Sequence, residues 1–137
     1  MSFVPTARTR LRVRYAETDQ MGVVYHSHYV VWMEVGRIEL CRANGLRYRD
    51  MEQHDGVLLA VAEVHCRYLA PARYDDEIEI EARVVEARPR MVTFGYIVRN
   101  ADTGRELATG ETRHVFVNRQ FKRCKLPKKY FALFGIG

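Results

Sequence analysis

Long apolar segments, paired cysteines and a leader-like N-terminus are absent from this chain of 137 residues. No run of apolar residues approaches the roughly 20 that a membrane-spanning helix needs. Cys41, Cys66 and Cys124 are odd in number and far apart, which excludes a disulfide framework and a Cys-x-x-Cys metal pair. The first fourteen residues carry four arginines with no apolar block behind them, so we expect no signal peptide and a cytoplasmic location.

The sequence also lacks the common motifs of hydrolytic and phosphate-binding sites. It contains no glycine-rich phosphate loop, no Gly-x-Ser-x-Gly segment and no His-Glu-x-x-His segment. His26 and His28 lie two residues apart, a spacing at which side chains of one helix do not face each other. His54 and His65 are isolated in the sequence. We therefore expect no metal site and no cofactor.

The composition is that of one globular domain with a basic end. Hydrophobic residues make up 47% of the chain and charged residues 28%, and the length is sufficient to bury a core. We assign residues 1–137 to a single domain, with its core at about 8–118 and a basic tail at 119–137. The net charge of +5 is unevenly placed, with a cluster at Arg119, Lys122, Arg123, Lys125, Lys128 and Lys129.

Two interpretations of this basic tail stay open. It is either a solvated surface or a site for phosphates or an acidic partner. Nucleic acid is the weaker candidate, because Phe121 is the only aromatic residue among these cations and bases need aromatic faces on which to stack. The same cations are expected to lower the pKa of Cys124. A catalytic role for Cys124 is not favoured, since no histidine or acid accompanies it.

The first half of the chain changes from one periodicity to another. Arginines alternate with apolar residues over 10–15, as in a half-buried strand. Helical spacing follows from Ser27, a suitable N-cap, to Gly45, a suitable stop. The predicted buried face holds Tyr29, Met33, Gly36 and Leu40, with Trp32 beside it.

Three residues of this helix carry further expectations. Glycine weakens a helix interior, so Gly36 predicts the close approach of another backbone. On the exposed side, Glu34 and Arg37 have a spacing that allows an ion pair, as do Glu39 and Arg42.

The second half of the chain is rich in strands. A short helix is expected at 48–53, before the turn 54–56, and strands at 57–69, 76–88, 91–100 and 106–118. Tight turns are expected at 88–90 and 102–104, and a terminal helix at 126–134. The order of one strand, a long helix and four strands excludes a doubly wound parallel sheet. It predicts an α+β fold in which one curved, mostly antiparallel sheet covers the helix.

The junction between the first strand and the long helix gathers ionisable side chains. Residues 15–29 read YAETDQMGVVYHSHY, with two acids, a glycine and two histidines. Backbone N–H groups at a helix start stabilise negative charge. Such a junction can form a hydrolytic site without a metal or a serine.

The pattern YxETDxxGxVxHxxY at 15–29 resembles the hotdog-fold thioesterases, and the likeness extends over roughly residues 8–118. The group is the 4-hydroxybenzoyl-CoA thioesterase family, in the small acyl-CoA thioesterase branch associated with the Tol–Pal system. The segment YLAPA at 68–72, followed by the acids at 75–77, is also similar to this family. The resemblance implies a hotdog fold, in which a curved, mostly antiparallel sheet of five strands wraps one long central helix.

The resemblance also implies roles for residues of the junction. Asp19 takes the place of the catalytic acid, which acts in relatives as a nucleophile or general base toward the thioester. Tyr15 and His26 would support it, and the backbone N–H near His26 would polarise the thioester carbonyl. Gly22 and Val24 would border the substrate, with Gly22 allowing the chain to approach it closely.

Elementary chemistry agrees with this assignment. Attack on a thioester carbonyl forms an oxyanion, which a fixed N–H at a helix start stabilises. A nearby carboxylate either attacks directly or activates water. Structural roles stay open beside these: Asp19 as an acid that caps the loop, Tyr15 as the end of a core strand, and His26 as a supporting group without a catalytic step. Glu17 and His28 are better explained as scaffold.

The implied reaction is the hydrolysis of an acyl-CoA thioester to a free acid and CoA. Members of the family pair through their sheets, so we expect a homodimer, assembled into a homotetramer, with sites at the dimer interface. The CoA phosphates give a use to four arginines near turns, which are Arg88, Arg90, Arg119 and Arg123. The basic tail would touch an acyl carrier protein or an anionic membrane surface, or pack on a neighbouring subunit. The acyl group is not determined.

Two other functions compete with hydrolysis. A hotdog dehydratase acting on hydroxyacyl thioesters needs a histidine and an acid on different elements, and the position of Asp19 in the junction loop argues against it. A non-catalytic basic binding module would bind polyanions in a salt-sensitive manner that does not depend on Asp19.

Overall fold

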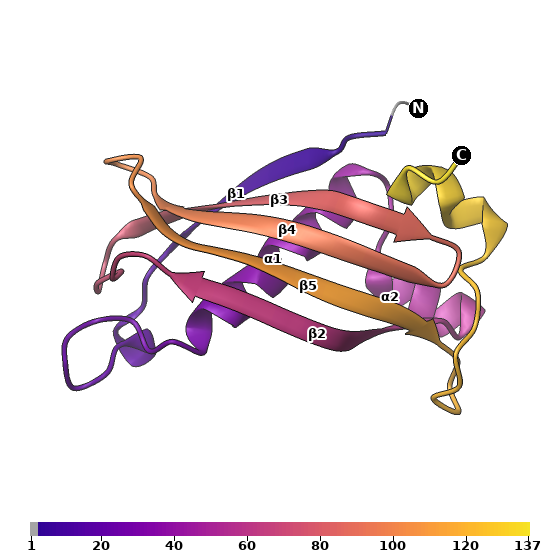
Figure 1. Cartoon of the computed structure of the whole chain (residues 1–137), viewed down its shortest axis with the longest axis horizontal. Coiled ribbons are helices and arrows are strands. Elements are labelled where there is room, and N and C mark those ends of the chain that lie inside the picture. Colours follow the sequence, from indigo (N-terminus) through magenta and orange to yellow (C-terminus); the bar gives the residue numbers. More distant parts are fainter. Residues whose placement is uncertain (1–2) are drawn as a thin grey trace.

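The computed structural model describes residues 3–137, which form a five-stranded sheet beside one long helix (Figure 1). The elements in chain order are β1 (Thr6–Arg12), η1 (Tyr15–Glu17), α1 (His28–Ala43), α2 (Tyr48–Asp50), η2 (Met51–Asp55), β2 (Leu58–Tyr68), β3 (Glu77–Arg88), β4 (Met91–Asn100), β5 (Glu106–Val117) and η3 (Lys128–Phe134). The strands lie in the order β1-β3-β4-β5-β2, and every neighbouring pair is antiparallel. The predicted α+β class and element order are confirmed. None of the helices within 3–137 combines the length and apolarity needed to cross a bilayer.

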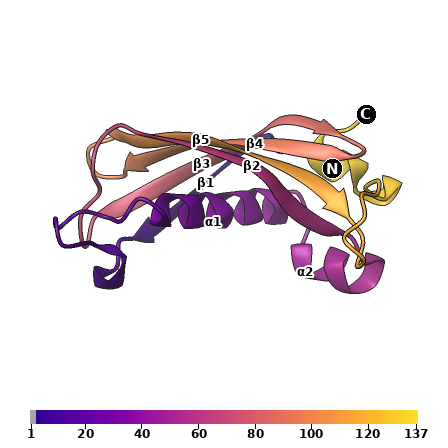
Figure 2. The same ribbon diagram turned by 60° about the horizontal axis from the view of Figure 1, so that its bottom comes forward.

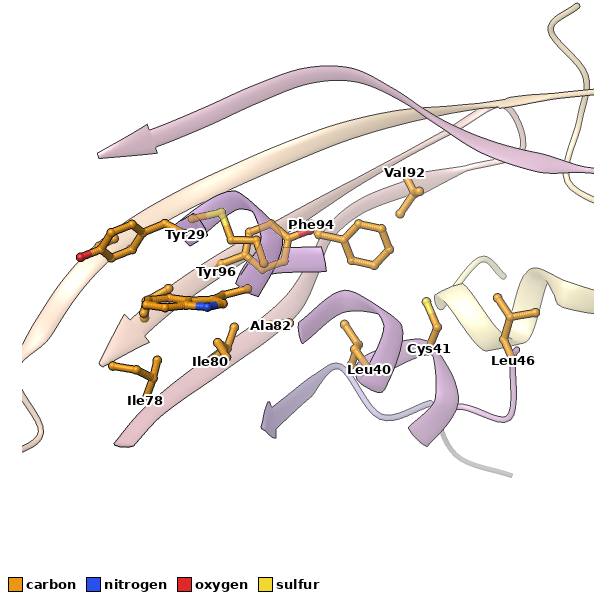
Figure 3. Packing of buried hydrophobic residues seen from close by; sticks show 14 of the residues in the cluster. Tyr29, Leu40, Cys41, Leu46, Ile78, Ile80, Ala82, Val92, Phe94 and Tyr96 are labelled. Carbon is orange, nitrogen blue, oxygen red and sulfur yellow. The ribbon is translucent and has the colours of Figure 1, made fainter. Parts of the chain in front are cut away.

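The core lies between α1 and the inner face of the sheet, which curves over the helix (Figure 2). Tyr29, Met33 and Leu40 are buried, as their spacing predicts, and Trp32 is 1% exposed. Side chains from the sheet meet them, among them Ile78, Ile80, Phe94 and Tyr96 (Figure 3). This packing stabilises α1 through its buried face and leaves the start of the helix free to carry polar groups.

Gly36 packs against β3. A Cβ atom built on Gly36 would be 2.7 Å from Cγ2 of Ile80 and 3.4 Å from Cβ of Ala82. The expected close approach is present, but the neighbour is the side chain of Ile80 rather than another backbone. The branched side chain of Ile80 fills the space that a helix residue would otherwise occupy.

Gly36→Val is therefore expected to lower the free energy of unfolding by about 1–3 kcal/mol, the usual effect of overpacking a core. Denaturant unfolding followed by circular dichroism measures this change. Ala43→Val is the matched control, because it adds a valine at an exposed position of α1, where the loss should stay below about 0.7 kcal/mol. Equal stability of Gly36→Val and the wild type would contradict the close contact.

The outer face of the sheet carries a ladder of ion pairs. The register of β1 and β3 places Arg8 opposite Glu81, Arg10 opposite Glu79 and Arg12 opposite Glu77. Arg8 lies 3.1 Å from the Glu81 carboxylate. These arginines are more than half exposed, so each pair contributes little to stability. The alternating arginines of the sequence are thus the solvent side of an edge strand.

The entry to the junction differs from its prediction. β1 ends at Arg12, and Tyr15 begins η1 instead of ending a core strand. Val13, 1% exposed, donates its N–H to the Asp76 carbonyl at 2.9 Å, and its own carbonyl accepts the Asp75 N–H at 3.0 Å. These bonds hold the chain at the end of the β1–β3 ladder. The next residues then turn away, and the Tyr15 side chain becomes exposed.

One capping detail and one helix type also differ. Ser27 occupies the N-cap position of α1, but its backbone is helical and its side chain makes no capping hydrogen bond. Gly45 follows the helix with φ of +86°, as a stop signal predicts. The expected terminal helix is the 3₁₀ element η3, preceded by Pro127.

Arg37 and Cys124 do not behave as expected. Arg37 is 8% exposed and forms no ion pair with a carboxylate within residues 3–137, so the pair with Glu34 is wrong, whereas Glu39 and Arg42 do pair. Burial raises the pKa of the Cys124 thiol, and the nearby charge of Arg90 opposes this without reversing it. The expected lowering of that pKa is therefore wrong.

β2 forms one edge of the sheet and exposes apolar side chains. Val61 is 52% exposed, Val64 42% and Tyr68 46%. Val61 pairs with His114 and Val64 with Thr112. Cross-strand partners share a face, and both partners are buried, so the two valines point to the inner side of the sheet. One copy of the chain leaves this part of its inner face uncovered.

Candidate active site

The junction loop between β1 and α1 is shaped by its own backbone. Thr18 and Val24 form an isolated antiparallel bridge, and the Asp19 N–H donates to the Val23 carbonyl at 2.9 Å. The Gly22 N–H donates to the Asp19 carbonyl at 3.0 Å, and its φ of +81° favours glycine. The loop projects from one end of the sheet (Figure 1).

A pocket of about 370 Å³ lies between this loop, the start of α1 and the end of β2. Its lining residues are Asp19, Met21, Val23, Val24, His26, Tyr29, Tyr68, Leu69, Ala70 and Pro71. The two sequence segments noted above, 15–29 and 68–72, thus meet in space. Of the predicted site residues, the pocket brings together Asp19, Val24 and His26. Gly22 shapes the loop without lining the pocket.

Asp19 is partly buried, and the loop uses one of its carboxylate oxygens. Oδ1 accepts the Met21 N–H at 2.9 Å, as in an Asx-turn. Oδ2 makes no hydrogen bond within residues 3–137. The structural and catalytic interpretations are compatible, because the turn fixes the direction of the carboxylate while its second oxygen is available to attack or to accept a proton.

The start of α1 presents free backbone donors to the pocket region. The helix begins at His28, and the N–H groups of His26 and Ser27 make no hydrogen bond in the described part of the chain. N–H groups at a helix start have no intrahelical partner, and they carry the positive end of the helix dipole. Beside the Asp19 carboxylate, they are suited to stabilise an oxyanion.

Tyr68 and Tyr29 form the aromatic wall of the pocket. Their rings meet edge to face, with centroids 5.1 Å apart. The Tyr68 hydroxyl donates to the carbonyl of His26 at 2.8 Å, and the Tyr29 hydroxyl accepts the Ala72 N–H at 3.1 Å. Burial, aided by Cys66, raises the pKa of Tyr68 to about 12, so its phenol stays a donor at neutral pH. Tyr68 therefore anchors the backbone segment that offers the free N–H groups.

Sequence reasoning missed this function of Tyr68. The family similarity of segment 68–72 is a local signal that points to this part of the chain. It does not reveal the contact with His26, which joins residues 42 apart in the sequence. The His26 ring itself is exposed and stacks on Tyr25, with centroids 4.3 Å apart. It therefore lies at the rim of the pocket.

Glu17 fastens the junction loop to the core. It is 3% exposed, and its carboxylate accepts the Arg14 N–H at 2.8 Å and the Trp32 indole N–H at 2.9 Å. His28 Nδ1 lies 3.8 Å from the same carboxylate. Burial raises the pKa of Glu17, but these hydrogen bonds and the charge of Arg14 outweigh it, so the net pKa is lowered. Glu17 and His28 thus support the loop.

Glu17→Gln is expected to lower the free energy of unfolding by about 1–3 kcal/mol at neutral pH, because an amide has one acceptor oxygen where the buried carboxylate accepts from two donors. The folded-state pKa is depressed, so this stabilisation is present above the unfolded-state pKa and is lost as the pH falls through the folded-state pKa. The deficit should therefore shrink in acid. Thermal unfolding over a pH series measures it, with the exposed Glu34→Gln as control. A deficit that stays constant from neutral to acidic pH would rule out this role.

Tyr15 lies outside the pocket lining. Its side chain is 77% exposed and packs edge to face on Tyr74, with centroids 5.5 Å apart. The structure therefore does not join Tyr15 to Asp19 and His26 within one copy of the chain.

The four arginines expected to bind CoA phosphates lie at the other end of the sheet from the junction loop (Figure 1). Arg88 and Arg90 flank the turn between β3 and β4, and Arg119 and Arg123 follow β5. Arg88 is 2.6 Å from Glu86, and Arg119 donates to the Gln53 carbonyl at 2.9 Å. Within one chain, these guanidinium groups do not reach the candidate site.

Other parts of the described structure are weaker candidates for the active site. No three histidine, cysteine, aspartate or glutamate side chains gather as metal ligands among residues 3–137. A larger hollow of about 650 Å³ lies over β2 and β5, with Arg67, Arg83 and Glu111 among its lining residues. It opens on the outer face of the sheet, away from α1. We place the candidate active site at the smaller pocket, where a carboxylate, free N–H groups and an aromatic wall converge.

Known proteins similar in sequence to this chain include thioesterases. A sequence model described as the Thioesterase-like superfamily matches residues 13–132. The chain is 34% identical over 125 residues to the putative acyl-CoA thioesterase YneP of Bacillus subtilis (strain 168), which covers 90% of this chain and 89% of that protein. It is 34% identical over 95 residues to the acyl-CoA thioester hydrolase YbgC of Escherichia coli O157:H7, covering 69% of this chain and 70% of YbgC.

Solved structures give the same fold. The DHNA-CoA thioesterase of Staphylococcus aureus superposes with a TM-score of 0.86 and 30% identity, covering 92% of this chain and 83% of that one. The predicted hotdog fold is confirmed.

Proposed function

Because this chain belongs to the Thioesterase-like superfamily, we propose that it is an acyl-CoA thioesterase, which hydrolyses an acyl-CoA thioester to a carboxylic acid and CoA. One observation carries the proposal: the Asp19 carboxylate lines the same pocket as His26, where the backbone N–H groups before α1 are free. The names of the relatives support hydrolysis over dehydration, the competing reaction, and over a non-catalytic binding module.

The proposed reaction uses one carboxylate and one water. Asp19 either attacks the thioester carbonyl carbon or removes a proton from an attacking water. The N–H groups at the start of α1 stabilise the resulting oxyanion. When the oxyanion collapses, the carbon–sulfur bond breaks and CoA leaves as a thiolate. If Asp19 attacks directly, water then hydrolyses the acyl-aspartate anhydride and restores the carboxylate.

Supporting roles follow the positions of the side chains. His26 at the pocket rim is proposed to exchange protons with the reacting groups, as an imidazole side chain can. Val24 lines the pocket and is proposed to contact the acyl group. Gly22 gives the loop its shape, and Tyr15 remains a supporting candidate on the outside of the loop.

We also propose a homodimer joined through β2, assembled further into a homotetramer. The exposed apolar side chains of this edge strand support the first step. Antiparallel pairing of two β2 strands would bring the far end of one sheet toward the junction loop of the other copy. Arg88, Arg90, Arg119 and Arg123 would then approach the phosphates of a bound CoA.

The family resemblance supports further proposals about this chain. We propose that the chain belongs to the acyl-CoA thioesterase branch associated with the Tol–Pal system, on the strength of its junction motif. Contact of the basic tail with an acyl carrier protein or an anionic membrane, the absence of a cofactor and a cytoplasmic location stay predictions.

A hydrolysis screen with short, long and aromatic acyl-CoAs tests the proposed function. A thiol reagent reports CoA release, and absorbance reports loss of the thioester bond. We expect several substrates to release CoA and acid in equal amounts. Formation of an enoyl product from a hydroxyacyl-CoA without thiol release would instead indicate a dehydratase. No reaction with any acyl-CoA would refute the proposal.

A further inference from the structure

A buried polar cluster lies between α1 and the sheet, beyond the candidate active site. Arg37 is 8% exposed, Thr112 and Tyr96 are 1% exposed, and His114 is fully buried. Buried charges in proteins are normally paired, yet Arg37 forms no ion pair within residues 3–137. Its Nε atom and Nδ1 of His114 have no hydrogen-bond partner. The proposed reaction uses none of these groups.

The hydrogen bonds of the cluster assign its protons. The Tyr96 hydroxyl lies 2.5 Å from Thr112 Oγ1, which lies 2.8 Å from His114 Nε2. Burial, and then the charge of Arg37, lower the pKa of His114 to about 3, so its ring is neutral and carries one proton. If Tyr96 donates to Thr112 and Thr112 donates to Nε2, both hydroxyl protons are bonded. The ring proton is then on Nδ1, whereas the other tautomer leaves a hydroxyl proton without an acceptor.

The two unpartnered atoms are therefore both donors. One is the Nε–H of a guanidinium, which is always charged, and the other is the Nδ1–H of a neutral imidazole. Nothing in residues 3–137 supplies the negative charge that would balance Arg37. The cluster thus lacks an acceptor, and the missing acceptor is best an anion.

The flank of α1 that faces β2 leads from the candidate active site toward this cluster. Near the pocket, Tyr29 contacts Tyr68. One turn later, the fully buried Met33 side chain fills the space beside Gly110, where a Cβ atom would lie 2.5 Å from Met33 Cε. An acyl chain that passes this point must displace the flexible Met33 side chain. One further turn brings Arg37 close enough to influence the pKa of His114.

The pairing of β5 with β2 places the cluster residues along the same flank. Gly110 pairs with Cys66, Thr112 with Val64 and His114 with Val61. Cluster residues on β5 therefore lie one strand in from the edge, beside the two exposed valines of β2 and on the same face of the sheet. Arg37 is nine residues after His28, which is about 13.5 Å along a helix that rises 1.5 Å per residue. This span suits an extended acyl chain better than a single aromatic ring.

We propose that Arg37 and His114 bind a carboxylate at the far end of the acyl group, so that the preferred substrates are CoA thioesters of medium-length dicarboxylic acids. This inference rests on the proposed thioesterase function. A carboxylate accepts from both free donors and balances the charge of Arg37. An alkyl end would leave the two donors and the charge unsatisfied.

Suberoyl-CoA and octanoyl-CoA test the inference, because the two acyl chains have equal length and differ in the terminal carboxylate. The wild type should prefer suberoyl-CoA in kcat/KM by about tenfold or more, the effect of a charged hydrogen bond. Arg37→Met should lower kcat/KM for suberoyl-CoA by about 10–100-fold and spare octanoyl-CoA, and Arg37→Lys should restore part of the loss. Arg42→Met is the matched control, since it makes the same exchange on the exposed side of α1.

A wild type that hydrolyses octanoyl-CoA at least as well as suberoyl-CoA would overturn the inference and leave thioesterase activity standing. So would a folded Arg37→Met protein with an unchanged preference. A binding measurement covers the case in which Arg37→Met does not fold. Free suberate should raise the Tm of the wild type more than octanoate does, and equal shifts would overturn the inference. Failure to hydrolyse any acyl-CoA would defeat the proposed function, while this Tm comparison would still decide the role of Arg37.

Discussion

Replacing Asp19 by asparagine is expected to remove most acyl-CoA hydrolysis, with kcat falling about 10²–10⁴-fold, the usual contribution of a general base. Asparagine has nearly the same size, and its Oδ1 can still accept the Met21 N–H that shapes the loop. The amide has neither the charge to attack a carbonyl carbon nor the basicity to take a proton from water. KM should change little, because the pocket wall is untouched. CoA release at saturating substrate measures the effect.

Asp102→Asn is the matched control for this experiment. It removes a carboxylate from the exposed turn between β4 and β5, so it changes the net charge by the same amount as Asp19→Asn. Both variants should unfold close to the wild-type temperature, and only Asp19→Asn should lose turnover. Full activity of a folded Asp19→Asn protein across the substrate panel would exclude the proposed mechanism, while membership in the superfamily would stand.

Placing lysine at both Val61 and Val64 is expected to give a folded monomer whose turnover is reduced by about 100-fold or more. Both valines are about half exposed in one copy, so lysine side chains can reach water without disturbing the core. Charges on an edge strand prevent its pairing with another chain, and two copies would bring like charges together. A site completed by a second subunit would lose its geometry, and small misplacements cost about 10²-fold in rate. Light scattering after size exclusion gives the mass, and CoA release gives the activity.

Val31→Lys with Val85→Lys provides the control, since these valines are 49% and 48% exposed on α1 and on β3, and β3 is separated from β2 by two strands. This double variant should remain dimeric and active. A fully active monomer from the first variant would show that one copy contains a complete site. An unchanged dimer would show that the subunits pair through another surface.

Local spacing explains why most of the fold could be predicted. The buried face of α1 followed from Tyr29, Met33 and Leu40, because helix geometry places such residues on one side whatever packs against them. The end of β1 could not be predicted in the same way. Where its ladder stops depends on bonds from Val13 to Asp75 and Asp76 of a distant turn.

In the candidate site, too, local features could be predicted and tertiary contacts could not. Asp19 could be identified because its motif is contiguous and its loop is closed by neighbouring backbone groups. Arg37 was misjudged, because a cation at helical spacing is expected to face solvent unless the covering strands are known. Its burial against β4 and β5 depends on which strand lies over that flank of the helix.

The sequence by itself determined the elements, their order and the carboxylate at the start of α1, since periodicity, turn residues and the junction motif are properties of residues close together in the chain. Only the tertiary structure decided that Tyr68 holds the free N–H groups before α1, that Arg37 lies buried without a counter-charge, and that β2 is an open edge. These features arise from the strand order β1-β3-β4-β5-β2, which brings distant segments together and which no local pattern specifies.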